Sequence, residues 1–300
     1  MRKSQIISLL ILLGLVTITI WVGALYDGGG KEIVTPTEAP GAANTDQTEA
    51  GVTPSPTTDI SDEEIMGLPT DTITWSPDFS DGALKITLDS SILEQMAKYG
   101  CIYDGSSFGQ EAAYITFDVG YGDEQDVKNI EAALDALKNT NIKAIFFVTD
   151  QFFTGSNIEN VVKRLVSEGH LIGNRGKLME SSNMSVLTVE EYRSALKTVE
   201  DGYKAIMGQD ASIQYFRPMS GAFSIRDLAI AKQMGYTTVL WTSLYASENL
   251  DNLENRISAE LQKNSIFSIM AYSVSGDSSA LESALNTAAS KYAIKQIGGQ

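Results

Sequence analysis

The sequence predicts an α/β protein with a mainly parallel sheet. Between residues 91 and 292, short apolar runs rich in β-branched and aromatic residues alternate with amphipathic segments at helical spacing. About seven strand–helix units follow one another, and strands that alternate with helices usually pair in parallel. The alternation alone leaves open whether the sheet closes into a barrel or stays open.

The first long strand is expected at Tyr114–Phe117, a run of strand-forming residues. Asp118 follows where the strand ends, and Gly120 permits a sharp turn. Ligands of α/β proteins bind at the carboxyl ends of the strands, so the Asp118 carboxylate is a candidate for chemistry. Taken alone, however, a carboxylate that only caps the turn is the better interpretation.

Periodicity and capping signals predict the remaining elements. Asp126 is the expected cap of a helix at 127–138, and Thr188 with Glu191 forms a capping box that opens a long helix. Gly169 and Gly235 end the helices that precede them. The other expected helices are 91–99, 158–168, 224–234, 250–263 and 279–292. The other expected strands are 143–148, 171–172, 215–217, 237–241 and 265–270.

The amino end predicts a membrane anchor and a stalk. Arg2 and Lys3 precede an apolar run, Ile6–Leu25, that is long enough to span a bilayer. The run is long for a cleaved signal peptide, so residues 1–26 are predicted to be an uncleaved transmembrane signal-anchor that leaves the rest of the chain extracytoplasmic. The alternative is cleavage and secretion. Residues 27–70, rich in Thr, Pro and Gly, predict a disordered stalk, which leaves 71–300 as the folded domain.

Composition narrows the choice of partner and of site. The net charge of −16 excludes a nucleic-acid binding role and disfavours close contact of the folded part with an anionic membrane. Cys101 is the only cysteine, so the chain has neither an intrachain disulfide nor a cysteine-based zinc site. His170 is the only histidine, which excludes a site with two histidine ligands.

Several segments together resemble the polysaccharide deacetylase (NodB-homology) family. Residues 113–122 resemble its first motif, and Gly120-Tyr121 is similar to the branch of delta-lactam-biosynthetic muramic acid de-N-acetylases. Further similar segments are 145–149, 168–174, 215–218 with Gly221, and 264–266. The resemblance implies an irregular (β/α) barrel of about seven strands, a divalent metal such as zinc, and hydrolysis of a C–N amide bond in an N-acetylated glycan such as peptidoglycan.

Carried over residue by residue, the resemblance implies a degenerate site. Asp118 stands at the position of the catalytic base, and Arg217 at the position that braces the base. The other motif positions carry residues unable to do the family's chemistry: Val119, Arg175 and Met179 at the metal-ligand positions, Met270 at that of the acid histidine, and Ser247 near that of its orienting aspartate. A fixed cation at Arg175 repels a dication. We therefore expect no metal cofactor, Asp118 paired with Arg217, and Arg175 in the metal's place.

Three functions remain open at this point. The first is a pseudoenzyme that binds peptidoglycan or another N-acetylated glycan, with Tyr121 and Tyr103 as candidate glycan contacts. The second is a residual de-N-acetylase with Asp118 as its base, although no visible residue replaces the metal or the acid. The third is a structural ectodomain.

Overall fold

The computed structural model describes residues 60–80 and 82–299, which form one compact unit. The predicted anchor, residues 1–26, and residues 27–59 of the predicted stalk lie outside the described residues. None of the described helices combines the length and the apolar character needed to cross a bilayer.

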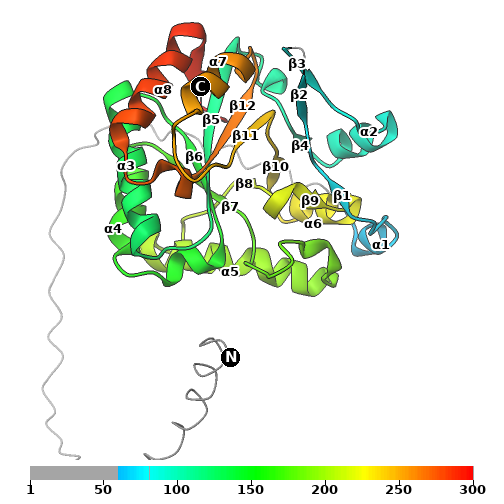
Figure 1. The fold of residues 1–300 in the computed structure, drawn as a ribbon. Helices are drawn as coiled ribbons and strands as arrows, with labels where there is room; N and C mark the ends of the chain where they lie inside the picture. The colour runs from blue at the N-terminus through cyan, green and yellow to red at the C-terminus, as the bar shows by residue number, and fades with distance from the viewer. Residues whose placement is uncertain (1–59, 81, 300) are drawn as a thin grey trace, which may run out of the picture. The chain divides into compact units, whose positions relative to one another are not determined.

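A parallel sheet organises the unit, as the sequence predicts (Figure 1). Eight of its nine strands follow one path: β11 (Ser243–Tyr245), β12 (Ile266–Met270), β5 (Ala112–Val119), β6 (Ile145–Val148), β7 (Leu171–Asn174), β8 (Tyr215–Phe216), β10 (Thr237–Val239) and β4 (Cys101–Ile102). The ninth, β13 (Ala293–Lys295), pairs with the first residues of β5. Every neighbouring pair is parallel.

The sheet curls into a half-barrel. β10 and β11 lie near opposite ends of the strand path, yet only residues 240–242 separate them in sequence. Four Cα steps span at most about 14 Å, so the two ends of the sheet are close in space. The link donates backbone hydrogen bonds to both sides, from Leu240 N to the Ile102 carbonyl and from Thr242 N to the Ile266 carbonyl, each at 2.8 Å. Among the described strands, β11 and β4 do not pair, so the curl leaves a seam.

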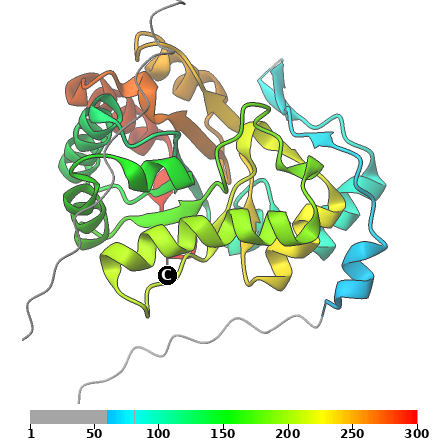
Figure 2. The same cartoon turned by 90° about the horizontal axis from the view of Figure 1, so that it is seen from below.

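Helices cover the outer face of the sheet. They are α2 (Ser90–Lys98), α3 (Glu124–Thr140), α4 (Ile158–Ser167), α5 (Val189–Met207), α6 (Ile225–Gln233), α7 (Leu253–Glu260) and α8 (Ser278–Lys291). Each predicted helix is present, and its ends differ from prediction by a few residues. In Figure 2 the yellow-green α5 runs across the near side of the unit.

Capping confirms one prediction and corrects another. Thr188 and Glu191 form the expected capping box at the start of α5. The cap of α3 is Asp123, whose carboxylate accepts hydrogen bonds from the backbone N–H groups of Gln125 and Asp126. The prediction that Asp126 caps this helix is therefore wrong, and its side chain is left for another partner.

Short elements absent from the sequence prediction complete the unit. A helix, α1 (Asp62–Met66), contacts α6, and its Ile65 is fully buried, so ordered structure begins ahead of the expected boundary at residue 71. Strand β1 (Ile73–Thr74) pairs with β9 (Ala222–Phe223), and β2 (Asp78–Ser80) pairs with β3 (Ala83–Lys85).

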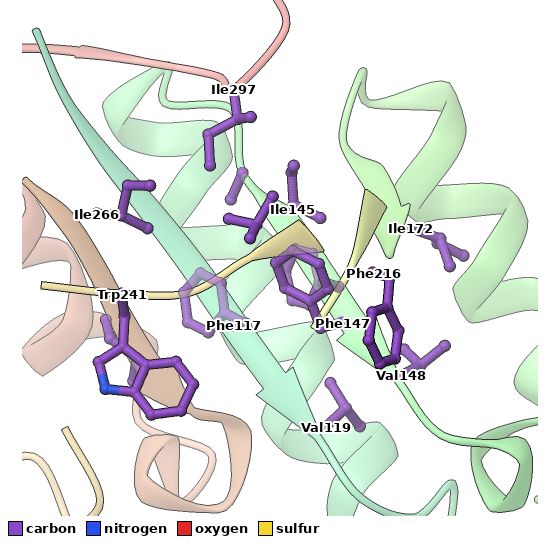
Figure 3. Close-up of a cluster of buried hydrophobic side chains, with 14 of the residues drawn as sticks. Phe117, Val119, Ile145, Phe147, Val148, Ile172, Phe216, Trp241, Ile266 and Ile297 are labelled. Carbon is purple, nitrogen blue, oxygen red and sulfur yellow. The ribbon is translucent and has the colours of Figure 1, made fainter. Parts of the chain in front are cut away.

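Apolar side chains pack on both faces of the sheet. Figure 3 shows Phe117, Phe147, Phe216 and Trp241 among the buried side chains. Phe117 stacks on Phe146 with ring centroids 4.8 Å apart. Val119, where the resemblance places a metal ligand, belongs to this buried cluster. The core therefore gives the carboxyl ends of β5 and β6 a rigid support.

Candidate functional site

An ion pair between Asp118 and Arg217 lies at the carboxyl end of β5. Arg217 Nη1 is 3.1 Å from Asp118 Oδ1, and both residues are almost fully buried. The hydroxyl of Ser268 on the neighbouring strand β12 donates to Asp118 Oδ2 at 2.8 Å. Each carboxylate oxygen of Asp118 thus has a partner within the protein.

Arg217 is held on every side. Its Nε and Nη2 donate to the carbonyl oxygens of Val239 and Leu240, at 2.9 and 3.2 Å. Its Nη1 also lies within hydrogen-bonding distance of the Thr116 and Ser268 hydroxyls. The guanidinium carbon is 4.0 Å from the centroid of the Phe147 ring, a cation–π contact. These contacts fix the guanidinium in one position, so the expected pairing of Asp118 with Arg217 is part of the core.

Arg175 is a second cation beside Asp118. It follows β7, and its backbone N–H bonds to the Val148 carbonyl at 2.8 Å, which places the residue next to the ends of β5 and β6. Arg175 Nε is 3.7 Å from Asp118 Oδ1, and Nη1 donates to the Val119 carbonyl at 3.2 Å. The structure therefore brings Arg175 next to Asp118 and Val119, from which α3 and α4 separate it by at least 56 residues.

The two arginines set the protonation of Asp118. Burial alone raises the pKa of this carboxyl group. The charges of Arg217 and Arg175, together with the hydrogen bonds from Ser268 and Arg217, outweigh burial and hold the pKa below its ordinary value. Asp118 is thus a stably ionised group whose proton affinity is low.

A cavity of about 640 Å³ opens above this ion-pair network. Asp118, Arg175 and Met270 are among its lining residues. Met270 pairs in register with Asp118 across β12 and β5, so it occupies the strand-end position where the resemblance expects an acid histidine. Tyr121, 55 % exposed, stands at the border with a second cavity of about 570 Å³, which it also lines.

The turn after Asp118 depends on a glycine other than the expected one. Gly120 has open space around its Cα and no positive φ, so the structure gives it no special requirement for glycine. A Cβ at Gly122 would lie 2.0 Å from the Phe152 carbonyl oxygen, and one at Gly155 only 1.6 Å from that of Gly122. The close backbone approach of Gly122 and Gly155 therefore shapes this side of the site.

Asp126 supports the same turn from α3. Its Oδ2 accepts a hydrogen bond from the Tyr121 backbone N–H at 2.9 Å, and the side chain lines the cavity. Burial raises the pKa of Asp126 to about 6. Asp126 is a second carboxylate of the cavity, with a proton affinity much higher than that of Asp118.

The remaining expected residues lie elsewhere. Met179 is half-buried against the core, and Leu178 lines the cavity in its stead. Ser247 is exposed and exchanges hydrogen bonds with Ser273. Tyr103 packs on Trp75 with ring centroids 5.1 Å apart and does not line the cavity.

His170 lies at the other end of β7 from the site. It precedes Leu171, whereas Arg175 follows Asn174. Its Nδ1 accepts a hydrogen bond from the Ala144 N–H at 3.2 Å, and burial lowers the pKa of the imidazole to about 4. The neutral, buried imidazole contacts the Phe146 ring of β6, with ring centroids 5.9 Å apart, and does not line the cavity.

The side chains of the site do not fit the divalent metal that the resemblance implies. No group of three or more His, Cys, Asp or Glu side chains in residues 60–80 and 82–299 is arranged to hold a metal ion. Asp118 already shares its oxygens with two arginines and a serine. The guanidinium of Arg175, at 3.7 Å, would repel a dication bound to that carboxylate.

Comparison with known proteins identifies the domain. The sequence model described as polysaccharide deacetylase matches residues 105–239. The chain carries a polysaccharide deacetylase domain. It is homologous to the peptidoglycan-N-acetylmuramic acid deacetylase PdaA of Bacillus subtilis, 30% identical over 159 residues, which cover 53% of this chain and 57% of that protein. It is also similar to a peptidoglycan-N-acetylglucosamine deacetylase of Bacillus cereus, 29% identical over 48% of this chain and 49% of that protein. The chain thus spans about half the length of these curated relatives.

Solved structures confirm the α/β half-barrel. The structure of B. subtilis PdaA, a family 4 carbohydrate esterase, superposes with a TM-score of 0.66 at 24% identity, covering 77% of this chain and 97% of that chain. A family 4 pseudoenzyme from Bacillus anthracis superposes with a TM-score of 0.54 at 19% identity, covering 66% of this chain and 67% of the other. At these identities the likeness is one of fold.

Two members of the site escaped prediction from sequence, Ser268 and Asp126. Ser268 interrupts the apolar strand Ile266–Met270, and a hydroxyl inside a buried strand is a signal of a polar partner nearby. In the sequence Asp126 resembles a helix cap, because it directly precedes the amphipathic segment at 127–138. The contact of Asp126 with the Tyr121 N–H needs three-dimensional information.

Proposed function

We propose that this chain binds N-acetylated glycan of peptidoglycan in the cavity above Asp118 and does not hydrolyse it. The observation that carries the proposal is the clamp of two arginines on Asp118: Arg217 at 3.1 Å and Arg175 at 3.7 Å. A carboxylate paired in this way stabilises the fold and does not act as a general base.

Proton affinity is the first argument against hydrolysis. A general base works best when its pKa lies near the operating pH. The clamp moves the pKa of Asp118 in the opposite direction, below the ordinary range of a carboxyl group. In addition, the carboxyl group is only 2 % exposed, so a water molecule has little access to its oxygens.

Charge stabilisation is the second argument. Amide hydrolysis needs a group that polarises the carbonyl and an acid that protonates the leaving nitrogen. A methionine, Met270, stands at the strand end where the resemblance expects the acid, and the sole histidine is remote from the cavity. Each tenfold in rate requires about 1.4 kcal/mol of barrier lowering, and the site lacks the groups that commonly supply it.

The shape and charge of the cavity support a glycan ligand. A volume of about 640 Å³ is ordinary for a small-molecule site. Tyr121 presents a half-exposed ring at the border of two adjoining cavities, where a sugar ring can stack on it. The chain's charge of −16 disfavours polyanions and is compatible with a neutral polyhydroxylated polymer. The homologous proteins of B. subtilis and B. cereus are named for deacetylation of peptidoglycan.

The proposed place of action is the outer face of the cytoplasmic membrane. The apolar run Ile6–Leu25 after Arg2 and Lys3 supports an anchor, and residues 27–59 of the predicted stalk, which precede α1, support a tethered domain that reaches the cell wall. If the anchor is cleaved, the same domain is secreted.

Retention of Asp118 favours a second candidate, a residual peptidoglycan de-N-acetylase. Three measurements on the full chain in detergent solution separate the candidates: zinc titration by calorimetry, acetate release from muropeptides, and co-sedimentation with purified peptidoglycan. We expect co-sedimentation without stoichiometric zinc binding and without acetate release.

A matched pair of variants tests where the glycan binds. Tyr121→Ala removes the exposed ring at the cavity and should reduce co-sedimentation, whereas Met66→Ala removes an exposed side chain of α1 outside the cavity and should not. Zinc binding with acetate release would establish the residual enzyme. Absence of both co-sedimentation and acetate release would leave a structural ectodomain.

A further inference from the structure

Arg175 has hydrogen-bonding capacity that its place in the fold does not use. A guanidinium carries five N–H donors. Within the described part of the chain, the side chain of Arg175 makes one hydrogen bond, from Nη1 to the Val119 carbonyl. Its Nε is buried and has no hydrogen-bond partner, because the 3.7 Å to Asp118 Oδ1 exceeds hydrogen-bonding distance. The guanidinium therefore keeps donors, those of Nη2 among them, that can donate hydrogen bonds to an acceptor on a ligand.

Arg175 lies in the wall of the cavity. The residue is 8 % exposed and lines the cavity together with Asp118. Its backbone is pinned by the hydrogen bond to the Val148 carbonyl, and its side chain by Val119 and Asp118. The guanidinium is therefore a fixed donor at the floor of the cavity.

Charge determines which kind of acceptor fits. Three carboxylates line the cavity, those of Asp118, Asp123 and Asp126. Two cations balance them: Arg175, which also lines the cavity, and Arg217, which pairs with Asp118 beneath it. The surroundings thus carry a slight negative excess, which disfavours an anionic ligand such as a phosphate or a carboxylate. A neutral carbonyl oxygen receives the hydrogen bonds of Arg175 without that repulsion.

Apolar side chains flank the same cavity. Leu178, Met219 and Met270 line it, two of them thioethers that adapt to the shape of a small apolar group. A methyl group attached to the carbonyl would contact these side chains. A neutral carbonyl that carries a methyl group is the chemistry of an acetamide.

We propose that Arg175 binds the carbonyl oxygen of an N-acetyl group, so that the cavity distinguishes N-acetylated from de-N-acetylated glycan without a metal ion. This inference rests on the proposed glycan binding and adds the group that is recognised and the residue that recognises it. A de-N-acetylated sugar lacks this oxygen, and its protonated amine has no lone pair that could accept a hydrogen bond from the guanidinium.

The test compares two probes, an N-acetylglucosamine tetrasaccharide and its fully de-N-acetylated counterpart, by calorimetry with the full chain in detergent and EDTA. The wild type should bind the acetylated probe at least tenfold more tightly. Arg175→Met should abolish this preference, since it keeps much of the length of the side chain and removes its donors. Lys177→Met is the control, because it removes one positive charge from an exposed neighbour outside the cavity.

A second measurement does not depend on the variant's folding. The Nε–H resonance of Arg175, assigned in a ¹⁵N-labelled wild-type sample, should shift on saturation with the acetylated probe, because the guanidinium gains an acceptor. An unshifted resonance at saturation would overturn the proposal.

The outcomes separate this inference from the proposed function. Wild-type binding of both tetrasaccharides without preference, or an Arg175→Met variant that keeps the preference, overturns the role of Arg175 and leaves glycan binding intact. Loss of binding in EDTA also overturns it, because a metal ion would then recognise the acetyl group. Failure to bind either probe, together with no co-sedimentation with peptidoglycan, overturns the proposed function itself.

Discussion

Replacement of Arg217 by methionine should destabilise the protein strongly. Methionine fills much of the same volume but removes every donor of the guanidinium, including the 3.1 Å contact with Asp118 Oδ1. Loss of one partner of a buried ion pair costs about 3–5 kcal/mol, since it leaves an uncompensated charge in the core. Arg175 and Ser268 still contact the Asp118 carboxylate, so we expect the lower part of this range, about 3–4 kcal/mol.

The assays are denaturant unfolding and thermal unfolding at pH 7, combined with a double-mutant cycle. In a domain of this size each kcal/mol lowers Tm by about 2–4 °C, so Arg217→Met should lower Tm by roughly 6–16 °C. Asp118→Asn in the Arg217→Met background should restore part of the loss, because it removes the unpaired charge. Lys128→Met breaks an exposed pair with Glu124 and should cost less than about 1 kcal/mol.

The pH dependence of stability gives an independent check on the direction of this effect. The pKa of Asp118 in the folded state lies below its unfolded value, so its stabilising contribution is complete above the unfolded pKa and is lost as pH falls through the folded pKa. The stability gap between wild type and Arg217→Met should therefore narrow in acid. Additivity of the two substitutions within about 0.5 kcal/mol, together with a gap that is constant with pH, would refute the clamp as the source of the stability.

Three further predictions concern residues near the site and the core. Asp126→Asn should raise the free energy of unfolding at pH 8 by about 1–3 kcal/mol. The pKa of Asp126 is raised to about 6 in the folded state, so the folded state loses stability as pH rises from the unfolded pKa to about 6. A gain that is equal at pH 3.5 and pH 8 would contradict this. His170→Gln should reduce the loss of stability that accompanies a fall in pH from 6.5 to 4. The pKa of the imidazole is lowered to about 4 in the folded state, so the unfolded chain is protonated more readily. If denaturant unfolding at a series of pH values shows the same loss in the variant as in the wild type, the prediction is wrong. Gly155→Ala should lower Tm by several degrees, because its Cβ would lie 1.6 Å from the Gly122 carbonyl oxygen. Gly120→Ala, the control, should leave Tm nearly unchanged, because nothing lies within 4 Å of its Cβ. A larger fall in Tm for Gly120→Ala than for Gly155→Ala would show that the turn is misassigned.

Local chemistry explains which parts of the fold the sequence could predict. The capping box of Thr188 and Glu191 and the stop at Gly169, which has a φ of 83°, depend on neighbours a few residues away. Long amphipathic helices have a clear period and buried strands are short continuous apolar runs, so the sequence predicts both. Strand pairs of two residues, such as β1 with β9, have no period that can be recognised, and their existence depends on what lies beside them in space.

The site divides in the same way. Asp118 and Arg217 stand at motif positions, so the resemblance identified them, and the structure brings them into contact. The hydroxyl that completes the network belongs to Ser268, 150 residues from Asp118, and its place is fixed by strand register, which aligns it with Thr116. Such register depends on the packing of the whole sheet, and the residues on either side of Ser268 give little indication of it.

The position of β5 in the sheet has a consequence for how the chain folds. This strand, which comes early in the described sequence, completes its hydrogen bonding only with β12 and β13, from the last 35 residues. The entropy cost of closing such long loops must be met before the stabilising contacts between these strands form, and this makes folding slow. A nascent chain truncated before Ile266 would leave one edge of β5 unpaired and the Asp118 carboxylate without Ser268, so the centre of the domain would be the last part to become stable.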